Sequence, residues 1–252
     1  MKVKKSDTLR ALALAALLCL SACATPVPTP ESVTPMANTE SWARWWMPRH
    51  EEKLAEVRKR QADKQRIDLV FIGDSITHFW ENAGKKVWDR YYAKYNALDL
   101  GFSADRTEHV LWRLQHGEVD GIDPKVAVLM IGTNNSGGQR EPKSTAAAIE
   151  RIIGELRQRL PHTKILLLGI FPRADMPGTP VNRINDEINS ILPGFADNRN
   201  IFFLNINRAL LSADGTLSKD VMPDLLHPNE KGYEIWAAEM EPELQKLMQQ
   251  VK

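Results

Sequence analysis

The sequence has 252 residues and a formal net charge of +1, because 33 basic side chains nearly balance 32 acidic ones. Such a balance lacks the positive excess with which proteins bind nucleic acid, so no nucleic-acid partner is expected. Its two cysteines, Cys19 and Cys23, both lie near the amino terminus. The rest of the chain therefore offers no disulfide, no cysteine nucleophile and no cysteine ligand for a metal.

The amino terminus has the pattern of an export signal. Basic residues within 1–10 precede an apolar run over 11–20, which is too short to span a bilayer. The run ends in LSAC at residues 20–23, which resembles the lipobox of bacterial lipoproteins. The resemblance implies a signal peptide over 1–22 and lipidation of Cys23, whereas an ordinary secretory signal is the alternative. Because alanine rather than aspartate follows the cysteine, we expect a lipid-anchored protein of the bacterial cell envelope, at the outer membrane.

The segment 23–40 contains four prolines among small polar residues. That composition predicts a semi-extended tether rather than a packed segment. Residues 41–252 have the length of a single domain with one sizeable core. Three tryptophans open this domain and are expected to cover one edge of the core, with a carbohydrate platform as the alternative. These are Trp42, Trp45 and Trp46, at the start of a charged helical pattern over 41–64.

From residue 68 onward, short apolar runs alternate with helical patterns. The runs are too short for helices and favour β-structure, so they predict strands buried on both faces. They cover residues 68–72, 96–100, 126–131, 164–170 and 201–204, and the first helical pattern between them spans 80–95. Five strand–helix repeats predict a five-stranded parallel sheet in a flavodoxin-like three-layer α/β/α sandwich.

A polar turn follows each of the first three predicted strands. The turns are GDS at 73–75, GFSADR at 101–106 and GTNN at 132–135. Ligands bind beyond the carboxyl ends of parallel strands, so the three turns are expected to share one rim of the sheet. Ser75 would then lie at a helix amino terminus, which favours developing negative charge and suits a nucleophile. A common turn with serine as N-cap is the alternative. In the second turn, Asp105 and Glu108 have the spacing of a capping box.

A serine nucleophile needs a base, commonly a histidine that a carboxylate orients. His227 has Asp224 three residues before it, in a loop that precedes the last helical pattern. His78 is close to Ser75 in sequence, but three residues along a helix its ring is expected to point away. The alternative for the loop is that Asp224 caps the last helix and His227 is a polar loop residue.

These segments resemble a known family. Blocks I, III and V of the SGNH (GDSL) hydrolases are matched by residues 73–75, 132–135 and 224–227. Residues 105–114 and 128–135 are similar to the catalytic subunits of intracellular platelet-activating-factor acetylhydrolase. The resemblance covers roughly 67–247 in unbroken order. It implies the SGNH hydrolase fold and ester hydrolysis through an acyl-enzyme, without a cofactor or a metal.

Carried onto this sequence, the resemblance makes Ser75 the nucleophile, His227 the general base and acid, and Asp224 the residue that orients His227. The family's acyl pocket is walled by the residues that follow the nucleophile, precede the oxyanion asparagine and precede the catalytic histidine. Here these are Ile76, Thr133 and Leu226.

The resemblance also implies an oxyanion hole. Its donors would be the backbone N–H of Ser75, the side-chain amide of Asn134 and one backbone N–H of the second turn. The family's oxyanion glycine falls on Ala104, whereas Gly101 matches an earlier glycine of the same turn. If φ is positive at Ala104, alanine costs about 1 kcal/mol or more in strain.

The sequence therefore predicts a lipid-anchored serine esterase that removes short acyl groups, in particular acetyl, from a carbohydrate or another small ester such as a lipid. A lysophospholipase or thioesterase for longer chains is the alternative within the class. A non-catalytic glycan-binding lipoprotein of the envelope is the alternative from another class.

Overall fold

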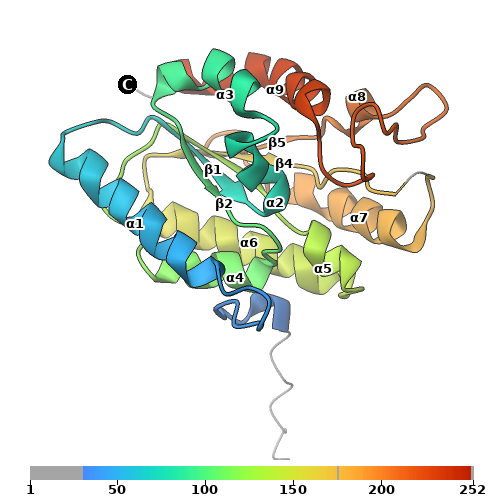
Figure 1. Cartoon of the computed structure of the whole chain (residues 1–252), viewed down its shortest axis with the longest axis horizontal. Helices are drawn as coiled ribbons and strands as arrows, with labels where there is room; N and C mark the ends of the chain where they lie inside the picture. Colours follow the sequence, from blue (N-terminus) through green and yellow to red (C-terminus); the bar gives the residue numbers. More distant parts are fainter. Residues whose placement is uncertain (1–30, 175, 251–252) are drawn as a thin grey trace, which may run out of the picture.

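A single parallel sheet organises the chain (Figure 1), and the computed structural model describes residues 31–174 and 176–250. The strand order is β2-β1-β3-β4-β5. This order is that of flavodoxin-like folds and confirms the predicted three-layer sandwich. The strands are β1 (Leu69–Gly73), β2 (Leu98–Gly101), β3 (Val126–Met130), β4 (Lys164–Leu168) and β5 (Ile201–Leu204).

Helices cover both faces of the sheet (Figure 1). One face carries α3 (Lys85–Tyr91), α8 (Asn207–Leu210) and α9 (Glu230–Gln250). The other carries α1 (Trp46–Ala62), α4 (Thr107–Gln115), α6 (Pro142–Arg159) and α7 (Pro180–Ile191). Two short helices, α2 (Ser75–His78) and α5 (Thr133–Gly137), follow strands directly. The 3₁₀ turns are η1 (Glu31–Val33), η2 (Phe79–Glu81), η3 (Ala93–Tyr95) and η4 (Leu192–Phe195).

The apolar residues of β1 alternate between two cores. Leu69 and Phe71 pack in the core beneath α3 and α9, whereas Val70 and Ile72 pack in the core beneath α4 and α6. All five residues of β1 are buried. Because helices cover both faces, no position along this strand favours a polar residue, which explains its continuous apolar run.

The helical pattern over 80–95 forms η2, α3 and η3 rather than one helix. The chain passes close to the aromatic core at Gly84, where an added Cβ would lie 2.6 Å from the ring of Trp80 and 2.9 Å from that of Tyr233. A side chain at this point would displace both rings. The break therefore follows from tertiary packing, which the spacing of apolar residues does not report.

Residues 31–40 pack against the domain instead of forming the tether that the composition predicts through residue 40. Ser32 is only 2% exposed, and its carbonyl accepts the hydroxyl of Thr107 at 2.9 Å. The N–H of Met36 donates to the carbonyl of Glu108 at 3.1 Å. These contacts use backbone groups, so they leave no apolar pattern in the sequence from which packing could be inferred.

The predicted signal peptide over 1–22, the lipidation site Cys23 and the first part of the tether lie outside the described residues. Across 31–174 and 176–250, no helix is long and apolar enough to cross a membrane.

Candidate active site

Three turns meet at the carboxyl rim of the sheet. In the parallel register, Gly73 at the end of β1 lies beside Gly101 of β2 and Met130 of β3. An added Cβ at Gly73 would lie 2.2 Å from Thr77 Oγ1 and 2.4 Å from the carbonyl of Met130. Only glycine therefore allows α2 to start this close to β3, and the turn brings Ser75 to the centre of the rim.

Asp74 fixes the start of α2. Its carboxylate accepts the N–H of Ile76 at 3.0 Å, which caps the helix. Complete burial raises the pKa of Asp74 to about 7, even though this N–H and the nearby Arg173 favour the charged form. Ser75 follows as the first residue of the helix and is 6% exposed.

Ser75, His227 and Asp224 are joined by hydrogen bonds. His227 Nε2 lies 2.8 Å from Ser75 Oγ, and His227 Nδ1 lies 2.6 Å from Asp224 Oδ2. Burial alone would raise the pKa of Asp224, but hydrogen bonds from the side chain and backbone of His227 outweigh it and hold the pKa below its ordinary value. An ionised Asp224 keeps the proton on Nδ1, which leaves Nε2 free to accept the proton of Ser75.

The loop that carries His227 is held from several sides. Asp224 Oδ1 accepts the N–H groups of Leu226 and His227 at 3.0 and 2.7 Å. Leu225 adopts a left-handed conformation with φ of 59°, and its carbonyl accepts the N–H of Ala174. The ring of Phe79 packs 4.9 Å from that of His227, centroid to centroid. His78, by contrast, places Nδ1 2.9 Å from Ser103 Oγ. Its ring makes no hydrogen bond to Ser75 in the described part of the chain.

The candidate oxyanion donors flank Ser75 on both sides. The side-chain amide of Asn134 donates to the carbonyl of Asp105 at 2.8 Å, and its second hydrogen has no acceptor among the described residues. This bond ties the turn after β3 to the turn after β2. Ala104 has φ of 62°, so the alanine at the family's glycine position is in the strained region. Its N–H has no acceptor within the described ranges, whereas the N–H of Gly101 already donates to Asp99 Oδ1 at 2.7 Å.

A buried charge network underlies the second turn. Asp105 accepts hydrogen bonds from Trp46 Nε1 at 2.6 Å and from Arg113 Nε at 2.8 Å. Arg113 also bonds Glu118 and lies over the ring of Phe102, 4.0 Å from its centroid. Burial raises the pKa of Asp105 to about 7, against the opposing influence of the Arg113 guanidinium.

The capping-box prediction for Asp105 is therefore wrong. The N-cap of α4 is Arg106, and the Asp105 carboxylate points into the protein instead of back to the helix. Sequence reasoning also missed Arg113 and Glu118. No local signal identified the pairing of Arg113 with Asp105, because Asp105 lies before the N-cap of α4 and Arg113 lies within the helix.

The three expected acyl-pocket residues belong to α2, to α5 and to the loop that carries His227. Ile76 and Thr133 are each 1% exposed, and Leu226 is partly exposed. The carbonyl of Ile76 accepts the hydroxyl of Tyr233 at 2.7 Å, and that of Thr133 accepts Arg173 Nη1 at 2.9 Å. These bonds fix the backbone on two sides of the site.

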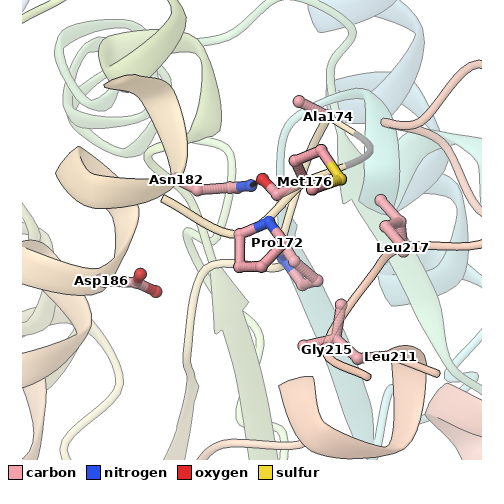
Figure 2. A pocket seen from close by; sticks show the side chains of 9 residues that line it. Pro172, Ala174, Met176, Asn182, Asp186, Leu211, Gly215 and Leu217 are labelled. Carbon is pink, nitrogen blue, oxygen red and sulfur yellow. Dashed lines mark hydrogen bonds between the residues drawn. The ribbon is translucent and has the colours of Figure 1, made fainter. Parts of the chain in front are cut away.

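A shallow cavity of about 60 Å³ lies beside the histidine loop, between the segment after β4 and the segment after α8 (Figure 2). Its wall is mostly apolar, with Pro172, Met176, Leu211 and Leu217, and Asp186 lies at the α7 side. Within the described residues, no cluster of three or more His, Cys, Asp or Glu side chains is arranged to hold a metal ion.

A flavodoxin-like sheet with Ser, His and Asp hydrogen-bonded at its carboxyl rim defines a class of ester hydrolases. The chain belongs to the GDSL-like lipase/acylhydrolase family, whose model matches residues 71–235. Platelet-activating factor acetylhydrolase IB subunit alpha1 of Homo sapiens is 31% identical over 201 residues, which cover 79% of this chain and 82% of that protein. The protein is accordingly a carboxylic ester hydrolase.

Solved structures share the fold. A GDSL-like lipase from Bacteroides thetaiotaomicron superposes with a TM-score of 0.59 and 18% identity, covering 77% of this chain and 98% of that chain. An acetylxylan esterase from Geobacillus stearothermophilus superposes with a TM-score of 0.57 and 19% identity, covering 70% of this chain and 93% of that chain.

Proposed function

We propose that the protein is a serine esterase that removes short acyl groups, in particular acetyl, by way of an acyl-enzyme on Ser75. The observation that carries this proposal is the hydrogen-bonded chain from Asp224 through His227 to Ser75. His227 Nε2 takes the proton of Ser75 Oγ as the oxygen attacks the ester carbonyl, and then gives it to the leaving alcohol. Water repeats these steps on the acyl-enzyme and frees the acid.

The oxyanion of each tetrahedral intermediate would be held by the N–H groups of Ser75 and Ala104 and by the side-chain amide of Asn134. All three donors belong to neighbouring strand ends, and the bond from Asn134 to the Asp105 carbonyl sets the amide before substrate binds. Donors that are already oriented stabilise developing charge without reorganisation.

A short acyl group is favoured by the residues expected to wall its pocket. Ile76 and Thr133 are buried and β-branched, so neither moves aside by a rotamer change. An acetylated carbohydrate or a small acetylated lipid fits this site, and the names of the relatives include an acetylhydrolase and an acetylxylan esterase.

The acyl preference can be measured with p-nitrophenyl esters of two to twelve carbons. We expect kcat/KM to be highest for acetate, lower for butyrate and poor from octanoate onward, since overfilling a packed site costs about 1–3 kcal/mol. In Leu226→Ala, the ratio of butyrate to acetate should rise about 3- to 10-fold. A maximum at eight carbons or beyond in the wild type would contradict the short-acyl assignment.

Hydrolysis of longer acyl chains, as by a lysophospholipase or thioesterase, is the second candidate. It is favoured by the apolar cavity beside the histidine loop, which offers Met176, Leu211 and Leu217 to a chain (Figure 2). The same ester series separates the two candidates.

We also propose that the enzyme is a lipoprotein of the bacterial envelope, anchored through Cys23. The support is the apolar run over 11–20 and the lipobox-like sequence that follows it. In Cys23→Ala, the esterase should remain active but leave the membrane fraction, because the variant cannot carry the acyl chains that would anchor it. Fractionation of cells without detergent, with p-nitrophenyl acetate as the assay, measures this. Wild-type enzyme in the soluble fraction would rule the anchor out.

A further inference from the structure

An open cavity of about 110 Å³ lies between the N-terminal segment 36–42 and the turn after β2. We propose that this cavity is a carbohydrate subsite, which binds a neutral sugar ring of an acylated substrate. The inference rests on the proposed esterase function and deepens it by naming the substrate class. One wall comes from residues that precede the family match, which begins at residue 71.

The cavity borders the active site. Ala104, whose N–H is the proposed oxyanion donor, is part of its lining, and Arg106 lines it two residues further on. Between them, the carbonyl of Asp105 accepts the side-chain amide of Asn134. A molecule in the cavity therefore touches the turn that carries the proposed oxyanion donor. We place the sugar ring of the substrate in the cavity and its ester at Ser75 on this ground.

His109, a mostly buried residue of the lining, carries a donor without a partner among the described residues. His109 is 5% exposed, and its Nδ1 accepts the N–H of Arg106 at 3.1 Å, which places the ring proton on Nε2. No side chain or carbonyl of the described residues accepts that proton. Burial, with Arg106 and Arg113 nearby, lowers the pKa of His109 to about 3, so the ring stays a neutral donor. A hydroxyl or ring oxygen of a sugar would satisfy it.

Polar groups of the N-terminal wall add to this donor. Asn38 is 7% exposed, and its Oδ1 accepts the N–H of Glu40 at 3.3 Å. The amide nitrogen of Asn38 has no acceptor among the described residues. The wall therefore presents amide and carboxylate groups, which match the hydroxyl edge of a sugar.

Trp42 supplies the apolar surface that a sugar ring also needs. It lines the same cavity and is 58% exposed, whereas Trp46, the first residue of α1, is fully buried. A large aromatic ring that stays in solvent beside polar donors suits a ligand with one apolar face and a polar edge.

The charges of the lining favour a neutral ligand. Arg106 and Glu40 bring opposite charges, and Glu31 is already paired with Arg140. A phosphate or carboxylate in the cavity would meet Glu40, and a cation would meet Arg106. A neutral polyol would bind better than either charged class, because its hydroxyls can donate to the Glu40 carboxylate and accept from the Arg106 guanidinium.

The test compares two acetyl esters, monoacetylated xylobiose, which keeps its other hydroxyls free, and p-nitrophenyl acetate, which has no sugar ring. In Trp42→Ala, the ratio of kcat/KM for the sugar ester to that for p-nitrophenyl acetate should fall about tenfold, mainly through KM of the sugar ester. Met47→Ala is the matched control, since Met47 is 37% exposed on α1 and lies outside the cavity lining. Its ratio should equal that of the wild type.

An unchanged ratio in Trp42→Ala would overturn the subsite, as would a wild-type enzyme that hydrolyses p-nitrophenyl acetate but not monoacetylated xylobiose. In both results the esterase function itself survives. Failure of the wild type on both esters would instead reject the proposed function, so the two failures are distinguishable.

Discussion

Ser75→Ala should lose about 10⁶-fold in kcat toward p-nitrophenyl acetate, by analogy with the removal of a nucleophile from other serine hydrolases. The reason is the position of Ser75 Oγ, 2.8 Å from His227 Nε2, which no other described hydroxyl shares. The substitution removes one oxygen from a nearly buried residue, so the folded structure and the melting temperature should change little. Any residual hydrolysis should come from substrate binding and the oxyanion donors alone, without an acyl-enzyme.

A fluorophosphonate probe gives the covalent readout of the same change. It should label the wild type on the peptide that contains Ser75 and leave Ser75→Ala unlabelled, because only an activated serine attacks phosphorus. Ser103→Ala is the matched control, since its hydroxyl also meets a histidine nitrogen, Nδ1 of His78 at 2.9 Å. Labelling that persists in Ser75→Ala would reject the nucleophile, and no labelling of the wild type would favour a non-catalytic glycan-binding protein.

Asn134→Ala should lower kcat by about 10²–10³-fold with little change in KM. The amide of Asn134 has one hydrogen on the Asp105 carbonyl and one without an acceptor in the described chain, which the oxyanion would take. That second bond strengthens only as negative charge develops, so its loss affects the transition state more than substrate binding.

Asn134→Ala also removes the hydrogen bond to the Asp105 carbonyl, so the control variant must lose a comparable side-chain hydrogen bond. Asn207 donates its amide to the carbonyl of Ile170 at 2.8 Å, in a partly buried setting that resembles that of Asn134. Asn207→Ala should lose a comparable stability of about 1 kcal/mol while kcat stays near that of the wild type. A kcat for Asn134→Ala no lower than that for Asn207→Ala would remove Asn134 from the mechanism.

The sheet and the central site residues could be predicted from the sequence because two constraints act together. Apolar runs of four to seven residues favour buried strands, and parallel strands bring their carboxyl ends to one rim. The turns that carry Ser75 and Asn134 follow two such strands, so both residues were expected at this rim. The loop of Asp224 and His227 joined them through the three-residue spacing of an acid and its histidine.

Other features depend on packing that local sequence does not report. Arg113 occupies a helical pattern that is equally typical of a solvated face, but in the fold it is fully buried and lies over the ring of Phe102. Several of the bonds that hold residues 31–40 use backbone groups, which any composition provides. The break at Gly84 arises from two rings, one of which, Tyr233, is distant in sequence.

The left-handed backbone of Ala104, with φ of 62°, has a consequence for how the second turn moves. Glycine at this position would visit several regions of φ and ψ, and its peptide plane could flip so that the N–H turned away from the substrate. A methyl group narrows the accessible basin and removes conformations from the unfolded chain, which offsets part of the native strain. Alanine therefore costs this turn some stability but holds the N–H, the proposed oxyanion donor, in one direction. Glycine would relieve the local strain and allow that N–H to turn away.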